Sequence, residues 1–291
     1  MAGAGANGRW PRRLLLLVIG LVLWSSAAAE APRRLVSLAP SLTELTCALG
    51  ACETLVAVDR ASTWPSELQA LPRVGDLHRP DLERIVQLAP DLVLSTPYGG
   101  AGARLRALGI PVATVATDRY QDLFLAIRQL GELLQRQEAA TALARRLRAE
   151  VAAVGERVAG LPTPRVYYEI DVTPYTVGGG SYVSSLVALA GGHNIAGELP
   201  EAYPRISPEL VLRAEPEVIV LANGPHGVSA ETVAARPGWA GMPAVRNGRV
   251  CALDQAAVDV LHRPGPRIGE ALGVLVRCLH PALDAGSQGG G

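Results

Sequence analysis

Four aromatic residues stand in loops where they could bind a ligand, although aromatic residues make up only 4% of the chain. They are Trp64, Tyr98, Tyr175 and Tyr203, and each lies next to proline or glycine. Tyr98 follows a predicted strand, and ligands of α/β proteins bind beyond the carboxyl ends of strands. Rings offer a large contact area at a small entropic cost, so this placement predicts a site for a large, flat ligand. The alternative is that the rings are hydrophobic plugs beneath loops.

A second group of polar residues lies near the C-terminus, where Asp259 is followed by Arg263 and Arg267 in a proline-rich loop. Arginines held by prolines can clamp a carboxylate or phosphate through paired donors. For Arg267 we favour the simpler interpretation, a surface turn with an arginine at the start of a helix.

Patterns typical of catalysis are missing from the sequence. Ser181 follows three glycines, but Val183 replaces the last glycine of G-x-S-x-G, and there is no H-E-x-x-H. We therefore predict no catalytic residue. The histidines are too widely spaced to predict a metal site, and we expect most of them on the surface or in loops: His78, His193, His226, His262 and His280.

Charge and composition exclude several functions. The chain has 27 basic and 27 acidic residues, so its net charge is zero, which argues against nucleic-acid binding. Every basic residue is arginine, and the lack of lysine excludes a Walker phosphate loop and a Schiff-base enzyme.

Short apolar runs alternate with helical stretches, a pattern that predicts parallel sheets with helices on their faces. The runs form two sets, which are 35–38, 55–58, 92–95 and 112–115, then 166–170, 218–222 and 250–253. Between the sets, residues 121–159 have few turn residues, and their later part carries apolar residues at spacings of three and four. This predicts a helix of about six turns that joins two α/β units and ends before Pro162.

The two halves also repeat each other. Residues 82–94 match residues 208–220 in register, each as a short helix, a proline and a buried strand. Asp81 and Ser207 are the expected N-caps. Two equivalent lobes imply a shared cleft between them.

A weaker sequence similarity relates residues 41–44 to residues 181–184, and each segment is predicted to begin a helix. Ser41 and Glu44 have the spacing of a capping box, in which the two side chains satisfy free backbone amides.

The N-terminus predicts export. Arginines precede an apolar run at 14–24 and a small-residue site, the layout of a signal peptide that we expect to be cleaved after Ala29. The alternative is an uncleaved anchor, but the run is shorter than the roughly 20 residues of a membrane span. No cysteine ends the run, so we expect no lipid anchor.

Four cysteines allow three full pairings in an exported protein: Cys47, Cys52, Cys251 and Cys278. We favour pairing within each half.

The order of several motifs resembles one family, the exported substrate-binding receptors of ABC importers for cobalamin, haem and iron chelates. These motifs are residues 34–39, 82–94, 191–195, 203–209 and 263–268, and the resemblance covers essentially the whole mature chain. Cobalamin-binding members are the most similar. The resemblance implies two Rossmann-like lobes joined by one long helix, with ligand bound in the cleft and no reaction catalysed.

By matched position, the resemblance places Tyr175 and Tyr203 among the cleft aromatics, and Asp259 and Arg263 as an acid and an arginine that touch the ligand. We add four further residues to the predicted ligand site, namely Trp64, Tyr98, Ser41 and Ser181.

Glu83 and Glu209 fall on the two lobe-tip glutamates that, in this family, pair with arginines of the membrane subunits. Two like charges at equivalent points suit a two-fold symmetric permease dimer. The alternative is that each glutamate only complements the dipole of its helix, which contributes about 0.3–1 kcal/mol.

This chain departs from the cobalamin-binding members at three positions. Leu77 stands in the place of a tryptophan, and Ala61 in the place of another cleft ring. Ala190 replaces one half of a family disulfide, so Cys278 needs another partner.

We therefore expect a periplasmic, monomeric receptor that carries a corrinoid to an inner-membrane ABC permease. The same role for haem or a ferric siderophore is the nearest alternative, with Tyr98 or Tyr175 as an iron ligand. An exported α/β enzyme and a sensor with a signalling partner are the others. The expected parts are a signal peptide at 1–29, lobes at 33–118 and 162–284, a helical segment at 119–161 and a flexible tail at 285–291.

Overall fold

The structure is a computed structural model that describes residue 3, residues 31–98 and residues 100–285. The expected signal peptide except residue 3, its cleavage after Ala29 and nearly all of the expected tail lie outside these residues. Within the described ranges, no helix is long and apolar enough to cross a bilayer.

The N-terminal lobe contains a four-stranded parallel sheet in the order β2-β1-β3-β4. Its strands are β1 (Leu35–Ser37), β2 (Leu55–Val58), β3 (Leu92–Ser95) and β4 (Val112–Thr114). The helices of this lobe are α1 (Pro40–Ala48), α2 (Leu82–Gln87) and α3 (Ala101–Ala107).

The C-terminal lobe contains a second sheet in the order β6-β5-β8-β9, with β7 paired to β5. Its strands are β5 (Arg165–Asp171), β6 (Tyr175–Thr176), β7 (His193–Asn194), β8 (Val218–Leu221) and β9 (Val250–Ala252). All pairs are parallel except β5 with β6. The helices are α6 (Tyr182–Leu189), α7 (Pro208–Ala214), α8 (Ala230–Ala234), α9 (Pro243–Arg246), α10 (Gln255–His262), α11 (Ile268–Leu279) and α12 (Ala282–Ala285).

Each of the seven predicted strands is confirmed to within one residue at either end. Strands β6 and β7 were not predicted, because two residues are too few to show an alternating pattern.

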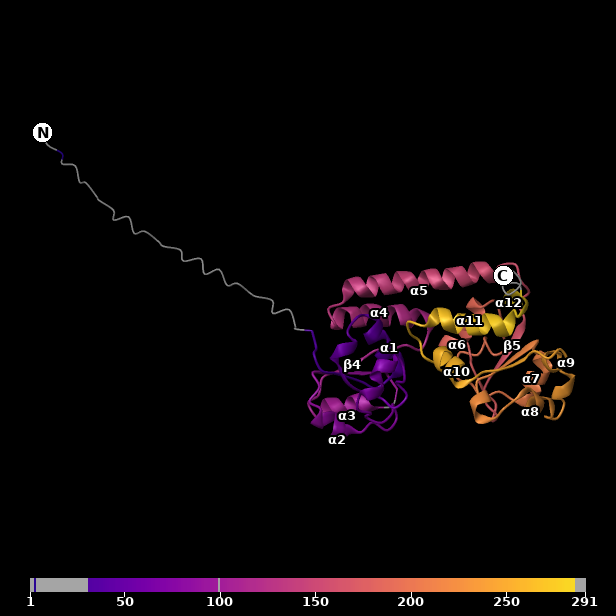
Figure 1. The fold of residues 1–291 in the computed structure, drawn as a ribbon, viewed down its shortest axis with the longest axis horizontal. Helices are drawn as coiled ribbons and strands as arrows, with labels where there is room; N and C mark the ends of the chain where they lie inside the picture. The colour runs from indigo at the N-terminus through magenta and orange to yellow at the C-terminus, as the bar shows by residue number, and fades with distance from the viewer. Residues whose placement is uncertain (1–2, 4–30, 99, 286–291) are drawn as a thin grey trace. The chain divides into compact units, whose positions relative to one another are not determined.

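Two helices, α4 (Tyr120–Leu133) and α5 (Gln137–Val158), join the lobes. Helix α5 is the predicted long helix, and its 22 residues make about six turns. It packs against α4 along its first part and against α11 along its later part, so it runs along both lobes (Figure 1). Gly131 of α4 allows this close packing, because an added Cβ would lie 2.5 Å from the Cβ of Ala140 in α5.

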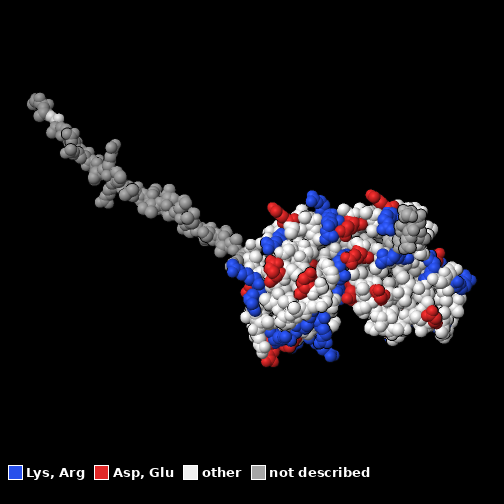
Figure 2. Space-filling model, in the orientation of Figure 1, with Lys and Arg blue, Asp and Glu red and all other residues white. Residues whose placement is uncertain are grey.

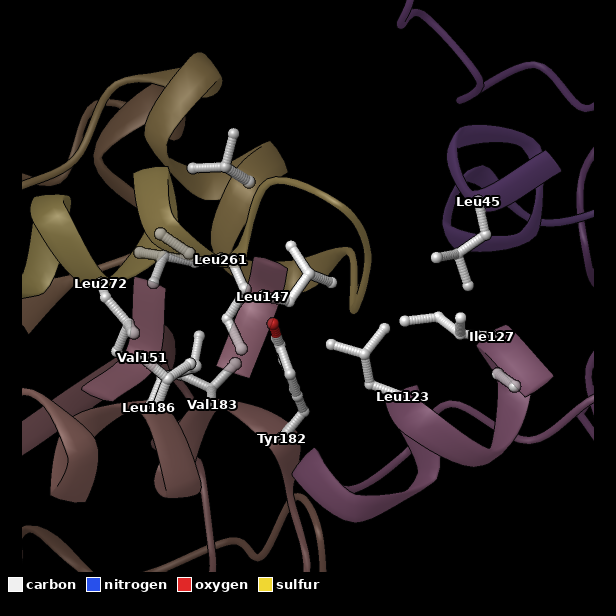
Figure 3. Close-up of a cluster of buried hydrophobic side chains, with 14 of the residues drawn as sticks. Leu45, Leu123, Ile127, Leu147, Val151, Tyr182, Val183, Leu186, Leu261 and Leu272 are labelled. Carbon is white, nitrogen blue, oxygen red and sulfur yellow. The ribbon is translucent and has the colours of Figure 1, made fainter. Parts of the chain in front are cut away.

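The apolar core has three parts because strand side chains alternate between the two faces of each sheet. Val36 and Val93 face a cluster confined to the N-terminal lobe, and Tyr167 and Ile219 face one confined to the C-terminal lobe. The opposite faces of both sheets belong to one large cluster that also includes residues of α4, α5, α6 and α11. Figure 3 shows Tyr182 of α6 pointing between Leu123 and Leu147 in this cluster. The two lobes therefore share a core.

The predicted repeat is confirmed: α2 leads to β3 and α7 leads to β8. Asp81 and Ser207 cap their helices by accepting from backbone amides three residues on. The capping box at Ser41 and Glu44 is wrong. Helix α1 begins at Pro40, which suits the first helical position, so Ser41 already lies inside the first turn.

The expected pairing of cysteines within each half is confirmed. Cys47 is bonded to Cys52, and Cys251 is bonded to Cys278. Ala190 occupies the position of the cysteine that, in the family, pairs with the counterpart of Cys278, and Cys278 is bonded to Cys251 instead.

Candidate functional site

A cavity of about 520 Å³ lies between the lobes. Its N-terminal wall comes from the segments that follow β1, β3 and β4, and its C-terminal wall from the start of α6, residues 202–203 and residues 262–264. The first wall thus lies at the carboxyl ends of three parallel strands, the usual position of ligands in such sheets. The volume falls within the roughly 300–1,000 Å³ of small-molecule sites.

Of the predicted ligand-binding residues, four line this cavity: Ser41, Tyr98, Tyr203 and Arg263. Tyr98 comes from the N-terminal lobe and Tyr203 from the C-terminal lobe, and their side chains are 51% and 57% exposed. Both rings therefore leave about half of their surface free for a ligand. Tyr98 and Tyr203 are therefore not buried plugs.

The loop that carries Tyr203 is held by the three glycines before Ser181. The amide of Gly178 donates to Ala202, and that of Gly179 donates to Leu199. A Cβ on Gly178 would lie 2.1 Å from the carbonyl oxygen of Glu201, so the backbones approach more closely than any other residue allows. The glycine run therefore positions this loop rather than a nucleophile.

The other four predicted residues lie outside the lining. Ser181 is buried, where its hydroxyl caps α6 and donates to the carbonyl of Gly178. Tyr175 lies in β6 beside Arg205 and is 44% exposed. Trp64 borders a separate hollow of about 580 Å³ within the N-terminal lobe. Asp259 is not part of the lining, but it accepts a hydrogen bond from Arg263, which is.

Arg267 is not the surface arginine that we expected. Its side chain is 12% exposed and binds the carboxylate of Glu44 in the opposite lobe. Its guanidinium carbon also lies 4.9 Å from the ring centroid of Trp64, a cation–π contact. Glu44 could not be predicted as its partner, since the two residues are 223 positions apart.

Asp118 and Thr117 form a polar edge of the cavity that sequence reasoning missed. The Tyr98 hydroxyl donates to Asp118, and burial together with this bond raises the pKa of Tyr98. Burial also raises the pKa of the Asp118 carboxyl. Burial and the nearby Asp118 charge raise the pKa of Tyr203 as well. Thr117 and Asp118 follow β4, so the rule that ligands bind beyond the ends of strands could have identified them.

His262 also lines the cavity, and its Nε2 lies 2.8 Å from the hydroxyl of Tyr168. His262 keeps accessible surface as a residue, and it is part of the cavity lining. Burial lowers the pKa of His262 to about 4, so the ring is neutral near pH 7. His280 lies in the loop between α11 and α12, as the sequence allowed, but it is buried, with Nε2 3.1 Å from the carbonyl of Ala190.

Two hydroxyls of the cavity wall are buried without a hydrogen bond in the described part of the protein, those of Thr96 and Tyr182. Over the same residues, no group of three or more His, Cys, Asp or Glu side chains could hold a metal ion.

Glu83 and Glu209 occupy equivalent positions, in the first turns of α2 and α7. Both are exposed. The Glu209 pKa is lowered by its own amide and by the Ser207 hydroxyl, so this carboxylate is charged at neutral pH. Figure 2 shows acidic and arginine side chains interspersed on the visible face, with much uncharged surface over the lobe that carries α7, α8 and α9.

Two α/β lobes that share a core thus meet at a cavity of the size that small molecules occupy. Residues 35–257 match the family described as periplasmic binding protein. The chain belongs to this family.

Relatives of this chain are binding proteins with different ligands. The vitamin B12-binding protein of Vibrio parahaemolyticus is 31% identical over 250 residues, which cover 84% of this chain and 88% of that protein. The periplasmic heme-binding protein RhuT from Roseiflexus sp. RS-1 is 30% identical with a TM-score of 0.76, over 86% of this chain and 99% of that one. The periplasmic vitamin B12 binding protein BtuF of Vibrio cholerae is 29% identical with a TM-score of 0.74, over 86% and 98%.

Proposed function

We propose that this protein captures a corrinoid, foremost cobalamin, in the interlobe cavity and delivers it unchanged to an inner-membrane ABC importer. It acts in the periplasm as a monomer. The relatives named for vitamin B12 support the ligand, and the two half-exposed rings on opposite walls suit a large, flat molecule.

The charge of the lining is the observation that favours a corrinoid over haem. Arg263 is the one arginine among the described lining residues, and its guanidinium already binds the carboxylate of Asp259 at 2.6 Å and the hydroxyl of Thr63 at 3.1 Å. Haem carries two carboxylates that need cationic partners. A corrinoid carries mostly neutral amides, whose N–H groups suit Asp118.

Haem or a ferric siderophore is the second candidate, because Tyr98 presents a hydroxyl at the cavity and phenolate oxygen is a known haem iron ligand. The similarity to RhuT supports it. The raised pKa of Tyr98 counts against it, since iron would have to displace the phenol proton.

A titration of the purified protein separates these candidates. Calorimetry with cyanocobalamin gives saturable heat with one ligand per chain if the proposal is right. Haemin is titrated in parallel by absorbance, and an intense shifted band with haemin but no heat with cyanocobalamin overturns the corrinoid in favour of haem.

Delivery to a permease is supported by the matched positions of Glu83 and Glu209 on exposed helix starts. The enzyme alternative requires a base beside Ser181. Its hydroxyl instead donates to a backbone carbonyl, so turnover that is lost in Ser181→Ala would be needed to revive that alternative.

A further inference from the structure

Glu44 is a charged residue in a place where charge is costly. It lies in the middle of α1 with 1% of its side chain exposed. A buried carboxylate is tolerated only when ion pairs and hydrogen bonds replace its lost hydration. The sequence predicted a local capping role for Glu44, and the structure excludes that role because α1 starts earlier.

The partners of Glu44 all come from the other lobe. Arg267 binds it through two bonds, Nε to Oε2 at 2.9 Å and Nη2 to Oε1 at 2.6 Å. Nη1 of Arg263 lies 3.5 Å from Oε1. These contacts exist only while the lobes stay together at this point.

Arg263 connects this ion pair to the cavity. It lines the cavity, binds Asp259 of its own lobe and donates to Thr63 of the opposite lobe. Together with Arg267 stacked on Trp64, these contacts form what we call the interlobe clasp: Glu44, Thr63 and Trp64 from the N-terminal lobe, and Asp259, Arg263 and Arg267 from the C-terminal lobe.

The clasp adds contacts of defined geometry between the lobes to the apolar core that they share. The hydrophobic attraction between apolar surfaces is not directional. A bidentate carboxylate–guanidinium pair has a fixed geometry. A clasp beside the cavity therefore fixes the separation of the two cavity walls.

We propose that Glu44 is a positioning residue for ligand binding, which acts through Arg263 and Arg267 to hold the lobes at the separation that the cavity needs. Trp64, Asp259 and Arg267 then serve the site by joining the lobes rather than by contacting ligand. This inference rests on the proposed function for its ligand, but the lobe separation is tested without any ligand.

The test is Glu44→Gln, which keeps the size of the side chain and removes its charge. Spin labels on unnatural amino acids at Leu108 and Val172, which are 56% and 59% exposed on different lobes, report the interlobe distance in the unliganded protein. We expect a wider distance distribution and an increase of about tenfold or more in the Kd for cyanocobalamin.

Glu169→Gln is the matched control. Glu169 is fully buried and bound by Arg236 through two bonds of 2.5 and 2.8 Å, but both residues belong to the C-terminal lobe. This control lowers the melting temperature, as a lost buried ion pair must, and leaves the distance distribution and the Kd unchanged.

An unchanged distance distribution in Glu44→Gln, or equal widening in Glu169→Gln, overturns the proposal. If Glu44→Gln does not fold, Arg267→Lys replaces it as the test, because lysine keeps the charge and loses the bidentate geometry. We then expect a smaller widening of the distance distribution and a smaller increase in Kd. If the wild type does not bind cyanocobalamin, the proposed ligand fails, while the distance measurement still decides the role of the clasp.

Discussion

Replacing Tyr203 by alanine removes a ring that a ligand in the cavity would cover. The side chain is 57% exposed in the unliganded protein. A fully covered aromatic side chain buries about 150–250 Å², so roughly 100 Å² of this ring is free for a ligand. At about 25 cal/mol per Å², and with most of that area covered, Tyr203→Ala weakens binding by about 2 kcal/mol, or roughly thirtyfold in Kd.

Calorimetric titration with cyanocobalamin measures this effect. Tyr203→Phe keeps the ring and should bind within about threefold of the wild type, since the expected contribution comes from apolar area. Tyr175→Ala removes a ring outside the lining, so its loss of affinity should be smaller than that of Tyr203→Ala. Leu108→Ala, at an exposed site outside the cavity lining, is the negative control. Wild-type affinity in Tyr203→Ala would refute the assignment of the cavity as the ligand site.

Three further predictions concern docking, pH and the disulfides. Reversing Glu83 and Glu209 to arginine together should abolish uptake in cells and leave cyanocobalamin affinity intact; weakened binding by the purified variant would contradict a docking role. Because burial lowers the pKa of His262 from 6.5 to about 4, the unfolded chain binds more protons in this window. The contribution of neutral His262 to the free energy of unfolding is therefore complete above pH 6.5 and is lost as the pH falls toward 4. Denaturant unfolding of His262→Gln should show a flatter pH dependence of this free energy, and equal slopes for the variant and the wild type would contradict the prediction. Replacing Cys251 and Cys278, which are 27 residues apart, should lower the free energy of unfolding by about 3.5 kcal/mol. Replacing Cys47 and Cys52, which are five residues apart, should lower it by about 2 kcal/mol. Urea titrations that rank the two pairs in the reverse order would reject the chain-entropy reasoning.

The architecture could be predicted because the informative patterns are local. Buried parallel strands form continuous apolar runs, and prolines mark the ends of helices, so the strands and the 22-residue helix α5 were visible in the sequence. The paired prolines at 90 and 216 made the internal repeat visible in the same way. The turn between α4 and α5 was not visible, because Gln135 takes the left-handed conformation there (φ 54°) and no glycine or proline marks the turn.

The site was only partly predictable. Tyr98 and Tyr203 were found because aromatic residues are rare and these two adjoin proline in loops. Ser181 and Trp64 share such loop signals but lie outside the cavity lining, since loop position does not fix the direction of a side chain. The role of Glu44 was beyond the sequence, because its partner is 223 residues away and nothing local marks the pair.

A crystal structure of the protein with cyanocobalamin tests the central claim most directly. We predict electron density for one corrin ring between Tyr98 and Tyr203, with the pair of Glu44 and Arg267 closed beside it and the ligand chemically intact. Density for the ligand at another surface, or a chemically altered ligand, would contradict the account.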